Sequence, residues 1–230
     1  MRESDSFDVQ RFHDLLLTGV RASFQRLQAQ FANEHIYFYA LCHQVDLSAI
    51  EAGIRTEAQL EEDVTGFRQA LQARQKTATV AEVRDLLRYD VPNARLRPGP
   101  QSDESLAQAQ ALAAAFGERF FADVDSHMSV DEQGNLEYTS PLEATYEAIL
   151  HAMQRVLLEL DAEGLFGVGE VRERVVVDLM WFEGGMSQSL PYLMGDAEMP
   201  PAPLNPQPVQ DRYHAALRRA LQIRHTLFSA

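Results

Sequence analysis

Cysteine is almost absent from this chain, because Cys42 is the only one among 230 residues. A single thiol cannot form a disulfide within the chain, which excludes the disulfide frameworks of small secreted proteins. Cys42 lies in an apolar segment, in register with Phe38 and Ala40, and this favours a buried structural thiol. His43 then points to the opposite face of the strand, so the two side chains cannot pair as nucleophile and base.

Long hydrophobic runs are also missing. The most apolar stretch, residues 175–182, is far shorter than the ~20 residues of a membrane helix, and it contains Asp178. Residues 1–5 lack the apolar stretch of a signal peptide. We therefore expect a cytoplasmic protein with no membrane partner.

Positive charge is scarce, since 20 Lys and Arg face 34 Asp and Glu, giving a formal net charge of −14. A field of this sign repels nucleic-acid phosphates, so we expect no nucleic acid as a partner. Two interpretations stay open: the ordinary surface of a cytosolic protein, and a surface that attracts a basic partner. Residues 207–230 differ, because their four arginines and one aspartate give +3 and leave −17 for the rest of the chain.

No motif of a standard catalytic or metal site is present. None of the seven histidines forms the helical pair of a zinc site. Asp123, Asp125 and His127 alternate, but the glycine that a calcium loop requires is missing and a solvated helix end explains them. Gly167 and Gly169 lack the third glycine, the lysine and the preceding strand of a phosphate loop. We therefore expect no metal and no cofactor, and favour a protein that is not an enzyme.

The residues that are present show clear periodicities, and 46% of them are hydrophobic. Helical spacing of apolar residues occurs over 7–31, 102–124, 141–163 and about 209–228. β-branched and aromatic residues predict strands over 36–45 and 175–182, with a partner strand over 48–54. This order predicts a helix-rich α+β domain around a small, mostly antiparallel sheet.

Capping signals mark several helix ends. Thr56, followed three residues later by a glutamine, predicts the start of a helix. Ser140, Pro141 and Glu143 have the pattern of a cap, a first helical residue and a capping box. Gly164 predicts the end of that helix, because a left-handed terminal residue costs glycine least.

Five of the ten prolines lie within residues 199–208, which predicts a stiff extended linker. We therefore expect one α+β domain over 1–198, the linker over 199–208, and a basic C-terminal helix over 209–230. The simplest arrangement is that this helix docks on the same domain. The alternative is an arm that reaches a separate partner.

A ligand site can be suggested only from neighbouring polar and aromatic residues. Trp181 lies near the end of an apolar strand, beside two glycines, and Tyr89 begins a proline-containing loop that extends to Arg97. His43 either is a satisfied core residue or lines a cleft. His43, Tyr89 and Trp181 are therefore the candidate ligand-binding residues, with core packing as the alternative for each.

Three segments together resemble a known bacterial family. They are Ile36-Tyr37-Phe38-Tyr39-Ala40-Leu41 with Ile54-Arg55-Thr56-Glu57, then Leu87-Arg88-Tyr89 with Pro92, then residues 160–167 with 172–177. This pattern is similar to the family of the domain of unknown function number 4303, over about residues 1–183. Arg55 departs from the asparagine usual there, and Asn93-Ala94 replaces an aromatic residue after Pro92. The family has no assigned chemistry, so the resemblance implies no catalytic residue.

The resemblance implies a likeness to immunity-type proteins, which neutralise bacterial toxins. Combined with the acidity, it makes a protein-binding module that captures a basic partner our first hypothesis. An enzyme or small-ligand binder that uses His43, Tyr89 and Trp181 is the alternative, and a homodimer is a third possibility.

Overall fold

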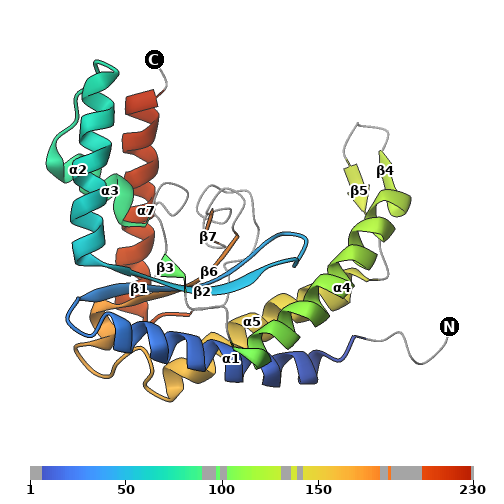
Figure 1. Ribbon diagram of the computed structural model, residues 1–230. Helices are drawn as coiled ribbons and strands as arrows, with labels where there is room; N and C mark the ends of the chain where they lie inside the picture. The colour runs from blue at the N-terminus through green and yellow to red at the C-terminus, as the bar shows by residue number, and fades with distance from the viewer. Residues whose placement is uncertain are drawn as a thin grey trace.

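The computed structural model describes residues 7–89, 97–98, 103–130, 136–138, 142–181, 186–187 and 204–228 (Figure 1). In chain order the helices are α1 (Val9–Gln30), α2 (Glu57–Ala73), α3 (Val80–Arg88), α4 (Glu104–His127), α5 (Glu143–Ala162), the 3₁₀ turn η2 (Arg172–Arg174) and α7 (Gln207–Phe228). The strands are β1 (Ile36–His43), β2 (Ile50–Thr56), β3 (Arg97–Pro98), β4 (Met128–Val130), β5 (Leu136–Tyr138), β6 (Val176–Trp181) and β7 (Met186–Ser187).

The main sheet has the order β3-β2-β1-β6-β7. β1 pairs antiparallel with β2 and parallel with β6, while the β2–β3 and β6–β7 pairs are antiparallel. The predicted α+β class with a mostly antiparallel sheet is therefore confirmed, with one parallel pair at its centre. A parallel pair needs a long crossover, and here the chain from α2 to η2 supplies it.

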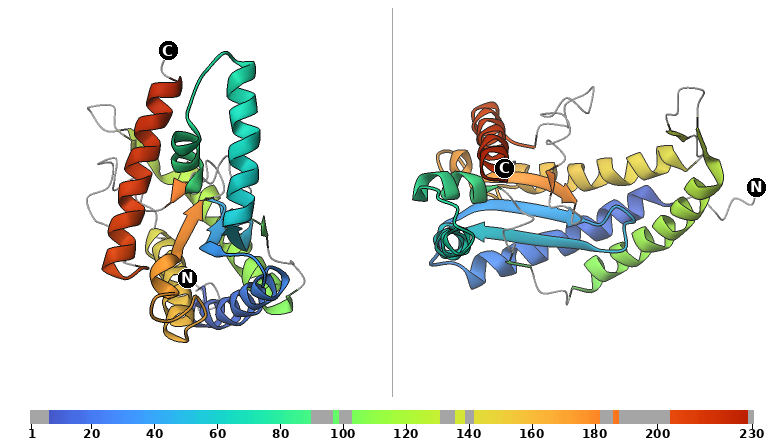
Figure 2. Two further views of the ribbon diagram at one scale, coloured as in Figure 1. Left: turned by 90° about the vertical axis from the view of Figure 1, so that its left-hand side faces the viewer. Right: turned by 90° about the horizontal axis from the view of Figure 1, so that it is seen from above.

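Helices cover both faces of the sheet (Figure 2). Tyr39 and Leu41 of β1 face a core formed with α1, α4 and α5, while Ala40 and Cys42 face a second core formed with α2, α3 and α7. Tyr37 joins the second core, although it is odd-numbered, because the β1–β2 register shifts at the start of β1. Such an irregularity re-aims a side chain.

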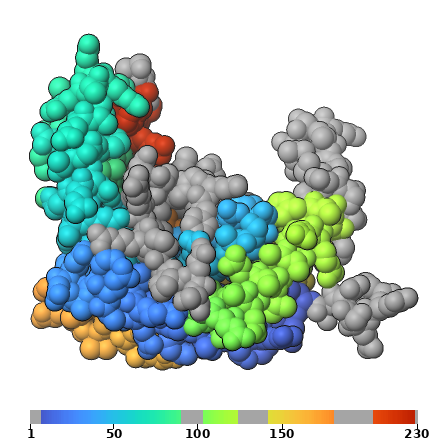
Figure 3. All heavy atoms as spheres, in the orientation of Figure 1, coloured from blue at the N-terminus to red at the C-terminus, as the bar shows by residue number. Residues whose placement is uncertain are grey.

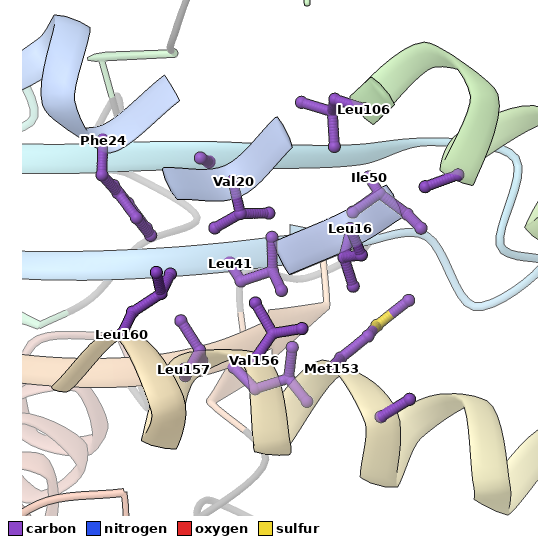
Figure 4. Packing of buried hydrophobic residues seen from close by; sticks show 14 of the residues in the cluster. Leu16, Val20, Phe24, Leu41, Ile50, Leu106, Met153, Val156, Leu157 and Leu160 are labelled. Carbon is purple, nitrogen blue, oxygen red and sulfur yellow. The ribbon is translucent and has the colours of Figure 1, made fainter. Parts of the chain in front are cut away.

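The first core is the larger of the two, and α1, α4 and α5 together supply most of it (Figure 4). Its labelled members are Leu16, Val20, Phe24, Leu41, Ile50, Leu106, Met153, Val156, Leu157 and Leu160. Burying a side chain of this size stabilises the fold by roughly 1.5–3 kcal/mol relative to exposure. The apolar residues that recur at helical spacing in the sequence are therefore those on the buried face of each helix.

The helix ends match the capping signals in part. Thr56 caps α2 and accepts a hydrogen bond from the Gln59 amide at 3.3 Å. Gly164 has φ +80° just after α5, as the left-handed position requires. α5 begins at Glu143 rather than at the predicted Pro141, which lies outside the described residues together with Ser140.

The C-terminal helix packs on its own domain. α7 contacts β6 and α3, and buries Val209, Tyr213 and Leu217 in the second core. Asn205 fixes its entry, because the Asn205 amide side chain bonds both the N–H and the carbonyl of Val177 at 2.8 Å. Residues 199–203 of the predicted linker lie outside the described part of the chain.

Hydropathy rules out a membrane span among the helices that the structure describes, since none is both long and apolar enough.

Candidate functional site

The structure does not bring the three predicted ligand-binding residues together. His43 and Trp181 are neighbours, because their Cα atoms are register partners in the β1–β6 pair. Tyr89 instead packs on Phe38, with ring centroids 5.9 Å apart, on the other face of the sheet from the side expected for His43. Phe38 lies five residues from His43, about 17 Å along a strand at 3.3 Å per residue. One pocket therefore cannot contain all three.

His43 is a fully buried side chain whose Nδ1 lies 2.9 Å from the Gln44 carbonyl. Burial lowers the pKa of His43 below its ordinary value, and the Gln44 carbonyl opposes this effect only in part. The ring is therefore neutral near pH 7, as a core histidine would be.

Tyr89 belongs to an aromatic cluster that closes the second core. Its ring lies 4.8 Å from that of Tyr213, whose hydroxyl donates to Asp178 Oδ2 at 2.6 Å. Burial raises the pKa of Tyr89. Burial, followed by the Asp178 charge, also raises the pKa of the Cys42 thiol, which stays protonated and structural as the sequence predicted. This cluster stabilises the fold and exposes no reactive group.

A stronger candidate is the segment from Asp103 to Glu163, which we call the acidic arm. It contains thirteen acidic residues and two arginines, a net charge of −11 out of the −14 of the chain. Its helix α4 lies at the end of the molecule away from α2, while α5 runs from that end beneath the sheet and alongside α1 (Figures 1 and 3). The acidity is therefore concentrated in one segment of the sequence.

The carboxylates near α1 are neutralised within the fold. Glu163 pairs with Arg21 at 2.6 Å, and Asp161 pairs with Arg172 at the same distance. The Arg21 hydrogen bond is the main reason why the pKa of Glu163 lies below its ordinary value. These charges contribute to the structure and are not free for a partner.

The carboxylates further along the acidic arm behave differently. Glu118, Glu143 and Glu147 are exposed, and none has an ion-pair or hydrogen-bond partner within the described chain. The same end is held rigidly, since the Phe120 and Tyr146 rings stack at 4.6 Å and the Tyr146 hydroxyl donates to the Val45 carbonyl at 2.9 Å. Burial, with the nearby Asp46 charge, raises the pKa of Tyr146 to about 12. Three uncompensated negative charges thus sit on an ordered scaffold.

The outer face of α4 is made mostly of small side chains. Over residues 104–123, where exposure is described, its exposed residues besides Arg119 are Glu104, Ala107, Gln108, Ala111, Ala115, Glu118 and Ala122. Four of these are alanines, so another protein surface can approach the helix closely. Because alanine has no side-chain rotamers, such a contact costs little conformational entropy.

A pocket of about 340 Å³ lies at the root of this face, between α1, the start of β2 and α4. Ser48, Glu51 and Gln110 supply its polar groups, and alanines of α4 form one wall. The Gln110 side chain donates to the Ser48 carbonyl at 3.0 Å and holds α4 beside β2. The pocket has room for one anchoring side chain.

A second pocket, of about 380 Å³, lies between α2, α3 and α7, and arginines line it instead of acidic residues. Neither pocket could be predicted from the sequence, because each is formed by elements that are far apart along the chain. The acidic arm is not evident from a net charge counted over the whole chain apart from the last helix. Counting the charge of each segment separately would have found the acidic arm.

No family model matches this chain, and comparisons with curated proteins and with solved structures give no match either. The resemblance to the domain of unknown function number 4303 therefore stays a prediction.

Proposed function

We propose that the protein is a binding module that captures a basic protein partner on its acidic arm. The exposed and unpaired state of Glu118, Glu143 and Glu147 carries this proposal. The excess of acidic residues over 103–163 that remains after Asp161 and Glu163 pair with Arg172 and Arg21 supports it. A surface with one sign of charge attracts a partner of the opposite sign over long range and speeds its association.

Two features of this region support a protein rather than a small cation as the partner. The alanine-rich face of α4 permits close approach over several helical turns. The pocket at its root has the volume to accept an anchoring side chain. Interfaces draw most of their binding energy from a few such buried anchors. The immunity-type role is the form of this function that the sequence resemblance implies.

We do not propose the alternative ligand site of His43, Tyr89 and Trp181, because Tyr89 lies far along β1 from the other two.

Affinity capture from the native host tests the proposal with two matched triple variants. E118Q/E143Q/E147Q removes three unpaired charges of the acidic arm, whereas E61Q/E62Q/E170Q removes three exposed carboxylates elsewhere. We expect the wild type and the control variant to retain a stoichiometric basic protein. We expect the arm variant to associate roughly ten times more slowly, because rim charges act mainly on the association rate.

The rate is measured by surface-based kinetics with the purified partner at low and at moderate salt. The absence of any stoichiometric partner would contradict the proposal. So would an acidic partner, or an equal loss of rate in the two variants.

A further inference from the structure

The helices α2, α3 and α7 together contain seven arginines and seven acidic residues, but these charges are not evenly distributed along them. Residues 64–81 and 213–230 each contain three cationic side chains and no Asp or Glu. α2 and α7 project from the same face of the sheet and α3 packs against both of them (Figures 1 and 2). Two cationic segments that are far apart in the sequence therefore meet in one place.

The pocket of about 380 Å³ lies in this cationic region and has an apolar floor. Leu71 of α2 and Leu86 of α3 are its most buried lining residues, while Phe67 and Phe228 supply aromatic walls. This volume lies within the range of about 300–1,000 Å³ typical of small-molecule sites.

Two guanidinium groups lie at the rim, Arg74 from α2 and Arg224 from α7. Both are exposed, and neither has an ion-pair or hydrogen-bond partner in the part of the chain that the structure describes. Two other arginines of these helices are neutralised: Arg84 bonds Glu61 at 2.6 Å and Arg219 bonds Asp85 at 2.7 Å. Arg68 and Arg218 have no carboxylate partner among the described residues, but they do not line the pocket. Arg74 and Arg224 are thus the arginines that combine an unpaired guanidinium with a place in the pocket lining.

Contacts between α7 and the α2–α3 connection lie beside the pocket. The Lys76 ammonium donates to the Leu227 carbonyl and lies 5.0 Å from the centroid of the Phe228 ring, which lines the pocket. These contacts hold the end of α7 that contains Arg224 and Phe228 against the α2–α3 connection.

We propose that this pocket binds a linear amphiphile with a carboxylate head and a saturated tail, of the size of decanoate. The carboxylate pairs with Arg74 and Arg224, and the tail covers Leu71 and Leu86. The volume of about 380 Å³ admits a small ligand of this class. The site lies outside the acidic arm, so this inference stands independently of the proposed function.

Isothermal titration with decanoate, below its micelle-forming concentration, tests the inference. We expect binding in the micromolar to millimolar range. Decanol, which has the same tail without charge, should bind about tenfold more weakly, because a hydrogen bond to a charged group is worth about one factor of ten. Decyltrimethylammonium should bind no better than decanol.

Variants separate this site from general hydrophobic binding. R74Q/R224Q should remove the preference for decanoate over decanol, whereas R68Q/R218Q, which changes two cationic residues of the same helices that do not line the pocket, should keep it. Circular dichroism checks that both variants are folded.

Three results would overturn the inference: no heat of binding with the folded wild type, equal affinity for decanoate and decanol, or the same loss in both double variants. An acidic peptide that binds through Arg74 and Arg224 while decanoate does not would also overturn it.

Discussion

At the scale of single residues, Arg55 connects three elements of the fold through one buried guanidinium group. Its side chain is fully buried, and its guanidinium bonds Asp63 at 2.7 Å and the carbonyls of Leu87 and Arg88. It therefore connects β2 with α2 and α3. The family resemblance leads one to expect an asparagine at this position, whose shorter side chain would reach fewer of these groups.

We predict that Arg55→Met lowers the free energy of unfolding by about 3–5 kcal/mol, because it leaves Asp63 and the buried Leu87 carbonyl without their donor. The Arg88 carbonyl keeps the Tyr37 hydroxyl as a donor. Urea denaturation followed by circular dichroism measures this change. Arg84→Met is the control, since its ion pair with Glu61 is exposed and contributes about 1 kcal/mol or less. Equal effects of the two substitutions would show that Arg55 does not hold these elements together.

At the scale of elements, α4 is positioned by a close backbone contact. A Cβ atom on Gly117 would lie 1.9 Å from the Asp46 carbonyl oxygen in the β1–β2 turn. Only glycine permits this approach, and the acidic face of α4 depends on it.

We predict that Gly117→Ala lowers the free energy of unfolding by about 1–3 kcal/mol, as overpacking does. Gly66→Ala is the control, because nothing lies within 4 Å of the added Cβ in the middle of α2. There we expect a gain of about 0.5–1 kcal/mol from helix propensity. Thermal denaturation measures both, and a neutral Gly117→Ala would mean that α4 shifts easily.

The helices and the central strands could be predicted from the sequence, because each buries one periodic face. The start of α2 at Thr56 and the end of α5 near Gly164 could also be predicted, because side-chain capping and a left-handed glycine depend only on neighbouring residues. The pairing of β1 with β6 could not be predicted, since β6 lies more than a hundred residues away. No local sequence pattern shows whether the two strands run parallel or antiparallel. The candidate site of His43, Tyr89 and Trp181 does not form one cluster because sheet faces and strand positions depend on that pairing.

At the scale of the whole molecule, charge is separated between two ends. The acidic arm has −11, whereas α7 and its flanking residues (207–230) have +3. Unpaired like charges repel, so the acidic arm lowers the stability of the protein that has it. Glu143 and Glu147 illustrate this cost, because they are four residues apart on α5.

We predict that sodium chloride, raised from low to physiological concentration, increases the free energy of unfolding by screening this repulsion. The increase should be smaller in E118Q/E143Q/E147Q, by a few tenths of a kcal/mol for each relieved pair. Urea titrations at several salt concentrations measure the difference, since urea itself is uncharged. A salt response that is identical in the two proteins would mean that these three carboxylates repel nothing.

The pairing of β1 with β6 also sets the order in which the chain can fold during synthesis. Val176, the first residue of β6, leaves the ribosome 133 residues after His43, the last residue of β1. At about 5–20 residues per second this interval is roughly 7–27 seconds. Throughout it, one edge of β1 is an open template for other nascent strands. Chaperones that shield strand edges should therefore matter more to the yield of this protein than to its final stability.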